Sequence, residues 1–252
     1  MNRQTMTVQD FFTENPRTAL GFSGGVDSAY LLWEAVHCGA QVRPYFVKSA
    51  FQPEFELRDA QRLCDELGVE LCVIPLDVLG IPEVCANPSD RCYHCKRAIF
   101  GALRERALMD GYPVLMDGTN ASDDAGDRPG MRALGELMVR SPLRECGITK
   151  AQVRERSREA GLFTWDKPAY ACLATRVPTG EPLSGELLER AEKAEDCLFA
   201  LGFTDFRVRV PGGVARIQVS DGQFALVVEK RREILERLGE LFTAVTLDLK
   251  GR

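Results

Sequence analysis

The strongest indication of the fold is the stretch Thr18-Ala19-Leu20-Gly21-Phe22-Ser23-Gly24-Gly25-Val26-Asp27-Ser28. It opens with a short apolar run, which is typical of a buried strand, and continues into a Ser-Gly-Gly turn. Over residues 26–38, apolar residues recur at helical spacing, and Gly39 stands where a helix would end. The stretch therefore predicts a strand, a tight turn and a helix in succession.

The same alternation of strand and helix continues through the first part of the chain. Apolar runs predict strands over residues 42–47, 69–76 and 113–116, and amphipathic patterns predict helices over residues 54–67 and 99–109. Strands that alternate with helices of this length indicate a parallel sheet that is covered on both faces. We therefore predict an α/β domain over residues 1–177, which binds ligands beyond the carboxyl ends of its strands.

A second module is predicted over residues 178–252, where the pattern changes. Helices are predicted over residues 184–201 and 224–238, and strands over residues 206–210, 215–219 and 244–249. The first two strands alternate apolar and charged residues, as half-exposed antiparallel strands do. Because about 75 residues make a small core, we expect this α+β domain to bind substrate or to form oligomer contacts.

The composition excludes several classes of protein. The 252 residues include 32 Lys and Arg against 37 Asp and Glu, and 45% of the residues are hydrophobic, so the chain is neither disordered nor strongly basic. The net charge of −5 argues against binding nucleic acid mainly through its phosphates. Without an apolar signal core or a run of about 20 apolar residues, we expect a cytoplasmic protein with no membrane partner.

The turn after the first predicted strand has the features of a phosphate-binding loop. Its glycines allow backbone N–H groups to face one point, and the following helix adds positive potential there. Ser23 and Ser28 add hydroxyl groups, and Asp27 could hold a Mg²⁺ ion that bridges phosphates. The lysine of a Walker loop is missing, and an ordinary strand-to-helix turn would use the same residue types. The candidate ligand-binding residues are Ser23, Gly24, Gly25, Val26, Asp27 and Ser28.

The nine cysteines do not form a recognisable disulfide framework. Cys92 and Cys95 form a Cys-x-x-Cys on a predicted loop, a spacing that suits zinc, an iron–sulfur cluster or a redox pair. A zinc site would need a second pair, which the sequence lacks. Together with Cys172 these two cysteines lie among polar and basic residues that favour chemistry, whereas Cys85 is undecided. The rest are interpreted as buried apolar residues: Cys38, Cys64, Cys72, Cys146 and Cys197.

Basic residues of the second part of the chain are candidates for anion binding. Arg207 and Arg209 share one face of a predicted strand, which suits a nucleotide phosphate, although a solvated strand face would look the same. Arg176 follows Cys172 closely and could bind a phosphate or carboxylate, or form a surface salt bridge. Asn120 and Asp124 follow the strand over residues 113–116, where they could contact substrate or Mg²⁺ or form an Asx-rich turn.

Two resemblances sharpen this interpretation. The Ser-Gly-Gly-Val-Asp-Ser string resembles the pyrophosphate loop of the PP-loop ATP pyrophosphatases, which have an adenine nucleotide alpha hydrolase-like fold and transfer AMP from ATP to a substrate oxygen. Several motifs resemble the LarE family: Cys-Tyr-x-Cys-Lys at residues 92–96, the segment over residues 117–124, Thr149-Lys150, Trp-Asp-Lys-Pro at residues 165–168 and the segment around Cys172. That family comprises ATP-dependent sulfur transferases that build the nickel-pincer nucleotide cofactor.

The LarE resemblance implies a reaction and its cofactors. ATP with Mg²⁺ would adenylate a carboxylate of pyridinium-3,5-biscarboxylic acid mononucleotide, and sulfur would then displace AMP to leave a thiocarboxylate. A glutamate of the helix over residues 184–201 would be catalytic, and Glu195 is the candidate, although an exposed helix face would look the same. Lys96 could neutralise the phosphate charge that develops during adenylation. The candidate nucleotide contacts are Asn120, Asp124, Arg176, Arg207 and Arg209. Relatives form hexamers through the C-terminal domain, so the resemblance also implies a homo-oligomer.

The family has two sulfur sources. In one branch three cysteines hold a 4Fe–4S cluster whose open iron carries an extra sulfide, and the resemblance implies this role for Cys92, Cys95 and Cys172. In the other branch the cysteine at the position of Cys172 gives up its own sulfur and becomes dehydroalanine. A zinc site or a structural thiol is a third reading of these residues. The sequence does not identify the donor that would reload the sulfide.

Three other functions remain open at this point. A tRNA-thiolating PP-loop enzyme should have a basic surface, which the net charge of −5 does not favour. An amide-forming synthetase would have no use for the three cysteines. A non-catalytic nucleotide-binding or metal-storage protein would not turn over ATP.

Overall fold

The computed structural model describes residues 6–123 and 129–252, which divide into two compact units. The first unit contains residues 6–49, 54–76 and 90–170, and the second contains residues 50–53, 77–89 and 171–252. The short segment that carries Cys172 thus packs with the second unit. The domain boundary expected between residues 177 and 178 stays a prediction.

The first unit is built on a four-stranded parallel sheet, in the order β3-β2-β1-β4. Its strands are β1 (Arg17–Gly21), β2 (Gln41–Lys48), β3 (Cys72–Pro75) and β4 (Val114–Met116). In the register, Leu20 of β1 pairs with Pro44 of β2 on one side and Met116 of β4 on the other. This sheet confirms the predicted α/β class.

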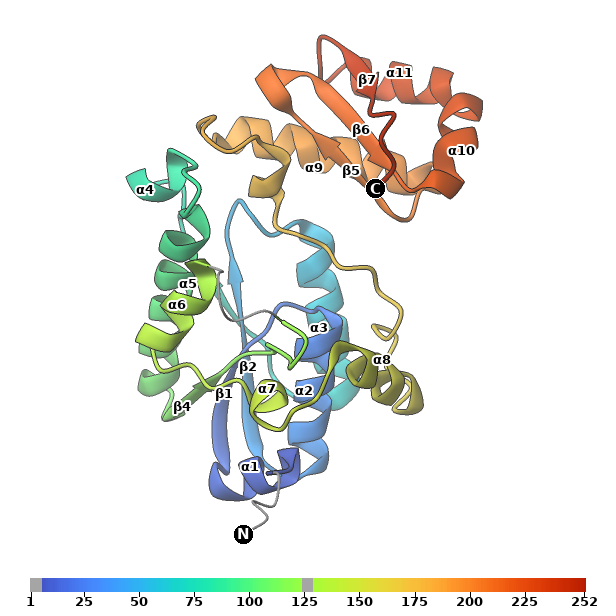
Figure 1. The fold of residues 1–252 in the computed structure, drawn as a ribbon. Coiled ribbons are helices and arrows are strands. Elements are labelled where there is room, and N and C mark those ends of the chain that lie inside the picture. Colours follow the sequence, from blue (N-terminus) through green and yellow to red (C-terminus); the bar gives the residue numbers. More distant parts are fainter. Residues whose placement is uncertain (1–5, 124–128) are drawn as a thin grey trace. The chain divides into compact units, whose positions relative to one another are not determined.

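Helices cover both faces of this sheet (Figure 1). They are α1 (Val8–Glu14), α2 (Val26–His37), α3 (Glu54–Leu67), α5 (Arg91–Met109), α6 (Pro129–Glu136), α7 (Pro142–Glu145) and α8 (Lys150–Glu159). Leu20 and Phe46 pack with residues of α1, α2, α3 and α8, whereas the neighbouring Ala19 and Tyr45 pack against α5. The alternation follows from the two-residue period of a strand.

The helix predicted over residues 99–109 begins eight residues earlier than expected, at Arg91. Cys92 and Cys95 therefore lie on the first two turns of α5, and the expectation that they occupy a loop was wrong. Residues 91–98 contain no Gly or Pro that would stop a helix, but they are too polar to show a helical apolar stripe.

The second unit combines a three-stranded sheet with helices (Figure 1). β5 (Phe206–Arg209) pairs antiparallel with β6 (Ala215–Val219), which pairs parallel with β7 (Val245–Leu247). Its α-helices are α4 (Pro82–Cys85), α9 (Gly185–Ala200), α10 (Phe224–Glu229) and α11 (Arg231–Gly239). Three short 3₁₀ segments are η1 (Leu173–Arg176), η2 (Pro211–Gly213) and η3 (Asp221–Gln223).

Two expectations about the second unit were wrong. The helix predicted over residues 224–238 is interrupted at Lys230, whose ψ of 6° is not helical, although its backbone still bonds to both flanking turns. β5 is not half-exposed, because Arg207 is buried together with Phe206 and Val208. In the described parts of both units, no helix has the length and apolar character needed to cross a membrane.

Candidate active site

The strand order of the first unit has one point at which α/β sheets bind ligands. β2 and β4 lie on opposite sides of β1, so the order of the strands reverses between β1 and β4. In open α/β sheets, ligands bind beyond the carboxyl ends of the strands at such a point. The loop over residues 23–28 follows β1, and the loop over residues 117–123 follows β4. The candidate phosphate loop therefore lies where the fold itself favours a ligand.

The backbone of the candidate phosphate loop is shaped by its glycines. Gly24 has a φ of +68°, and a Cβ atom there would lie 3.2 Å from the carbonyl oxygen of Glu56. Gly25 is the N-cap of α2, and no side chain of the described residues caps that helix. The N–H groups of the first turn of α2 are therefore suited to an anion, with the positive end of the helix dipole behind them.

The two serines of this loop hold its backbone in place. The hydroxyl oxygens of Ser23 and Ser28 lie 3.1 Å apart, and the Gly25 N–H donates to Ser23 Oγ at 3.3 Å. Ser28 Oγ donates to the Gly25 carbonyl oxygen at 3.2 Å, and the residue is only 3% exposed. Ser28 thus braces the loop from inside, whereas the exposed Ser23 can also offer its hydroxyl to a ligand.

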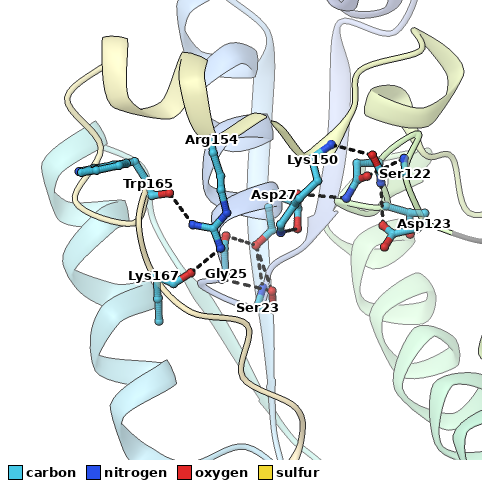
Figure 2. A network of polar contacts seen from close by, with 12 residues as sticks. Ser23, Gly25, Asp27, Ser122, Asp123, Lys150, Arg154, Trp165 and Lys167 are labelled. Carbon is cyan, nitrogen blue, oxygen red and sulfur yellow. Dashed lines mark hydrogen bonds and ion pairs between the residues drawn. The ribbon is translucent and has the colours of Figure 1, made fainter. Parts of the chain in front are cut away.

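The carboxylate of Asp27 is held between an ammonium and an amide (Figure 2). Lys150 Nζ lies 2.5 Å from Asp27 Oδ2, and Asn120 Nδ2 donates to Asp27 Oδ1 at 3.2 Å. Asn120 is 1% exposed, and its own Oδ1 accepts the Ser122 N–H at 2.8 Å. A Mg²⁺ ion bound to Asp27 would therefore have to share the carboxylate with the Lys150 ammonium or displace that ammonium.

Gly118 allows the loop after β4 to approach the phosphate loop closely. A Cβ atom at this position would lie 2.7 Å from the backbone nitrogen of Ser28 and 3.0 Å from its Cα. Both neighbours are backbone atoms of α2 and cannot turn aside as a side chain could. Any residue other than glycine would therefore push the Asn120 loop away from Asp27.

A second lysine reaches the phosphate loop from the segment after α8. Lys167 Nζ donates to the Gly24 carbonyl oxygen at 3.2 Å and to Asp59 Oδ2 at 2.6 Å. Arg154 of α8 fixes this segment by donating to the carbonyl oxygens of Trp165 at 2.7 Å and Lys167 at 2.9 Å. Lys150 and Lys167 thus bring two positive charges to a loop that has no Walker lysine.

Neither lysine was among the predicted site residues. The signals were present, since Thr149-Lys150 and Trp165-Asp166-Lys167-Pro168 belong to the motifs that carry the family resemblance. Their roles could not be read from the sequence, because Lys150 lies 123 residues from Asp27 and Lys167 lies 143 residues from Gly24. Only the fold shows that both motifs contact the loop over residues 23–28.

The Cys-x-x-Cys pair and Lys96 lie on the first turns of α5. Cys92 is exposed and accepts a contact from Arg91 Nη2 at 3.6 Å, whereas Cys95 is 9% exposed. Their spacing of three residues places both on the same side of the helix. The side chain of Lys96 runs past α6, because a Cβ atom on Gly130 would lie 2.8 Å from Lys96 Cδ.

Arg176 and Glu195 form a buried ion pair in the second unit. Arg176 Nε and Nη2 lie 2.7 Å and 2.8 Å from the two carboxylate oxygens of Glu195. Their side chains are 0% and 2% exposed, so this is not the surface salt bridge considered for Arg176. Glu195 Oε1 also accepts the Val208 N–H of β5 at 2.9 Å.

Arg207 is buried and Arg209 is half-buried. Arg207 is 6% exposed and donates from Nη1 to the Phe206 carbonyl oxygen at 2.6 Å, which excludes a solvated strand face for this residue. Arg209 Nε donates to Gln218 Oε1 at 3.0 Å. Burial, with the neighbouring charges of Arg176 and Arg252, lowers the pKa of the Arg209 guanidinium.

The cysteines that were predicted to ligate a cluster are divided between the units. Cys92 and Cys95 belong to the first unit and Cys172 to the second, so the set of three stays a prediction. Within residues 6–123 and 129–252, no three His, Cys, Asp or Glu side chains are grouped as ligands of a metal ion would be. The predicted contact residue Asp124 lies outside the described residues.

The remaining cysteines vary in burial. Cys64 and Cys72 are buried, as predicted, and burial raises the pKa of the Cys64 thiol to about 12. Burial also raises the pKa of Cys146 to about 11. Cys38, Cys146 and Cys197 are only half-buried. The undecided Cys85 donates from Sγ to the Leu183 carbonyl oxygen at 3.2 Å.

Comparison with known proteins shows relatives over nearly the whole chain, although no family model matches it. An uncharacterized protein of Synechocystis is 37% identical, over 97% of this chain and 92% of the relative. The pyridinium-3,5-bisthiocarboxylic acid mononucleotide synthase of Lactiplantibacillus plantarum is 32% identical, over 93% of this chain and 86% of the relative. The tRNA-specific 2-thiouridylase MnmA of Frankia alni is 29% identical, over 60% of this chain and 53% of the relative.

The parallel sheet, the loop at its point of strand reversal and these relatives define an ATP-dependent sulfurtransferase of the PP-loop class. Within this class, the extent of the match separates the two kinds of relative, since the thiouridylase matches only part of the chain. The chain belongs to the LarE family, the family of pyridinium-3,5-bisthiocarboxylic acid mononucleotide synthase.

Proposed function

We propose that this protein uses Mg-ATP to adenylate a carboxylate of pyridinium-3,5-biscarboxylic acid mononucleotide and then converts it to a thiocarboxylate. The observation that carries this proposal is the pairing of Asp27 with Lys150 and Asn120 at the phosphate loop. It supplies charge and polar groups where a triphosphate would lie. The choice of substrate rests on the relative that is named for the bisthiocarboxylic acid product.

The first half of the reaction needs phosphate binding and charge stabilisation. A carboxylate oxygen of the mononucleotide would attack the α-phosphorus of ATP, and the bond to the β-phosphate oxygen would break to release pyrophosphate. The N–H groups at the start of α2 and the Ser23 hydroxyl would bind the leaving pyrophosphate. Lys150 and Lys167 would offset the negative charge that grows on it.

Asp27 is the residue that would hold the Mg²⁺ ion. Its carboxylate is the ligand type that Mg²⁺ prefers, and it stands in the first turn of α2 next to the loop. The bound ion would neutralise phosphate charge. Asn120, which was predicted to contact the nucleotide, would act through its hydrogen bond to Asp27. Asp124, which lies outside the described residues, is proposed as a further contact of the nucleotide.

Basic residues outside the loop would serve the mononucleotide. We propose that Lys96 on α5 offsets charge during adenylation, and that Arg207 and Arg209 bind the substrate phosphate. Each arginine is held by at least one bond to the protein, and a guanidinium has five N–H donors in a fixed plane. A planar guanidinium that is held in this way suits the recognition of a phosphate.

For the second half of the reaction we propose a 4Fe–4S cluster held by Cys92, Cys95 and Cys172. The donor set suits such a cluster, since α5 presents two sulfur atoms three residues apart and the third cysteine would leave one iron open. When bound, the cluster would supply the sulfide that replaces AMP. The alternative is sulfur donation by Cys172 itself. We also propose a homo-oligomer, on the family resemblance alone.

The proposal is tested with the full-length protein, the biscarboxylic acid mononucleotide, Mg-ATP and sulfide. We expect AMP and pyrophosphate to be released together and a thiocarboxylate to be detected by mass spectrometry. A Lys150→Met variant should release pyrophosphate about 100-fold more slowly, because a charge at the phosphates is lost. The matched control is Lys193→Met on the exposed side of α9, which should behave as the wild type. Wild-type protein that releases neither product would contradict the proposal.

A further inference from the structure

We propose that the buried pair Arg176 and Glu195 positions Cys172 and makes no direct contact with the substrate. Arg176 was expected to contact the nucleotide, and Glu195 was expected to be catalytic. The proposal rests on the proposed function in one respect, because it gives Cys172 a part in the sulfur chemistry. It concerns contacts within the second unit only.

The backbone around Cys172 is held by three hydrogen bonds to two successive peptide groups. Arg176 Nη1 donates to the carbonyl oxygen of Ala171 at 2.9 Å, immediately before the cysteine. The hydroxyl of Thr175 donates to the carbonyl oxygen of Cys172 itself at 2.8 Å. The N–H of Leu173 donates to the carbonyl oxygen of Phe51 at 3.0 Å. The cysteine therefore lies on a short segment that is fixed on both sides.

These anchors are connected to the rest of the unit through the ion pair. The Thr175 hydroxyl that donates to Cys172 also accepts a bond from Arg176 Nη1 at 3.0 Å. Arg176 in turn is held by both carboxylate oxygens of Glu195 on α9, and Glu195 accepts the Val208 N–H on β5. One hydrogen-bond network thus joins η1, α9 and β5. Through Arg176 it contacts Ala171, the residue before Cys172.

The burial of the pair argues against direct contact with substrate. The guanidinium of Arg176 is 0% exposed, and the carboxylate of Glu195 is 2% exposed. For a ligand to reach either group, the pair would have to open and leave a charge without its partner in the interior, which is strongly unfavourable. A buried and fully connected polar network instead makes a segment rigid.

Rigidity at this segment has a chemical use. The position of a cysteine sulfur is set by its backbone and by a single side-chain torsion. Whether Cys172 ligates a cluster or gives up its own sulfur, its Sγ must stand in one place relative to its reaction partner. The network restricts backbone motion at Cys172, where such motion would move the sulfur away from its reaction partner.

The first test uses Thr175→Val, which keeps the side-chain volume but removes the hydroxyl that contacts both Cys172 and Arg176. Full-length protein is treated with a chelator and then with iodoacetamide, and alkylation of each cysteine is followed by mass spectrometry. Loss of the two hydrogen bonds of this hydroxyl should let the segment open at least about fivefold more often and raise the alkylation rate of Cys172 by the same factor. Cys85, in the same unit, should keep its rate and serves as the internal reference.

A matched control is Thr246→Val on β7, because Thr246 also donates its hydroxyl to a backbone carbonyl, that of Ala215 at 3.1 Å. It should leave the alkylation of Cys172 unchanged. The second variant is Arg176→Met combined with Glu195→Gln, which removes both charges and keeps an oxygen acceptor for the Val208 N–H. It should also raise the alkylation rate of Cys172.

Two results would overturn the proposal. The first is an alkylation rate of Cys172 that stays at the wild-type value in both test variants, above all if the double variant raises the KM for the mononucleotide, as direct contact would. The second is an equal rise at Cys85 or in the Thr246 control, which would mean general loosening. Because alkylation requires no turnover, it decides the matter even if wild-type protein forms no thiocarboxylate.

Discussion

Asp27 is the residue on which the phosphate loop most depends, because its carboxylate orders groups from two other segments. It accepts a bond from Asn120 and pairs with Lys150 at the start of α8. Replacing Asp27 by Asn should lower the rate of pyrophosphate release about 100-fold and weaken its dependence on Mg²⁺, since a neutral amide is a poor Mg²⁺ ligand. The measurement is the initial rate over a range of Mg²⁺ concentrations.

The control for this variant is Asp65→Asn on α3, where the carboxylate is exposed and bonds only locally to Gln61 among the contacts of the described chain. Its rate and Mg²⁺ dependence should match those of the wild type. If Asp27→Asn retained both, the loop would not be using this carboxylate for its metal.

Gly118 offers a steric test of the same loop. A methyl group in Gly118→Ala would stand 2.7 Å from the Ser28 nitrogen, so we expect a loss of about 1–3 kcal/mol in stability and a higher KM for ATP. Gly101→Ala is the control, because nothing lies within 4 Å of a Cβ atom there and alanine favours the helix interior. Thermal unfolding and ATP titrations measure both effects. A Gly118→Ala protein as stable as Gly101→Ala would show that the two loops can separate freely.

The short helix α7 carries an ion pair that should make stability depend on pH. Burial tends to raise the pKa of Glu145, but the Arg140 guanidinium and the Ser141 N–H lower it more, so the pKa lies below its usual value of 4.5. The stabilisation is therefore present above pH of about 4.5 and is lost as the pH falls through the lowered folded-state pKa. Glu145→Gln should unfold at a lower temperature at pH 7, and the difference should shrink toward pH 3.

The exposed Glu229→Gln variant at the end of α10 is the control for this pH series. Its melting temperature should follow that of the wild type at every pH. A gap between Glu145→Gln and wild type that stays constant from pH 7 to pH 3 would mean that the carboxylate charge does not stabilise α7.

The elements of the chain were predictable wherever one periodicity dominates. The helix over residues 54–67 has the predicted ends, since its apolar stripe is clear and Gly68 follows it. The start of α5 was missed because residues 91–98 are too polar to show a helical apolar stripe. The break at Lys230 was missed because no Gly or Pro marks it in the sequence. The helix is interrupted only by the ψ angle of Lys230.

The candidate site was predictable in its parts but not in its assembly. Asp27 and Asn120 were chosen from separate motifs, and the structure places them in contact. Lys150 and Lys167 were not chosen, because long-range pairing leaves no local periodicity to detect. Likewise, the charges of Arg176 and Glu195 suggested a surface or a ligand, and only packing of the second unit shows that each is the other's partner.

The proposed sulfur source is a property of the whole molecule, because the three cysteines proposed for it come from both units. If Cys92, Cys95 and Cys172 hold a 4Fe–4S cluster, anaerobically purified protein should be coloured and contain about four iron atoms per chain. Cys92→Ala should lose most of this iron, because two thiolates hold such a cluster poorly. With added sulfide, the wild type should form more than one thiocarboxylate per chain, since the cysteines are not consumed.

The control for the cysteine variants is Cys197→Ala on α9, a half-buried thiol for which no chemistry is predicted. Its iron content and colour should equal those of the wild type. A colourless, iron-free protein that transfers sulfur once would contradict the cluster, and loss of the elements of H₂S from Cys172 would establish the sacrificial route. Under either route, Cys172→Ala should still release AMP and pyrophosphate, because the phosphate loop and its two lysines belong entirely to the first unit.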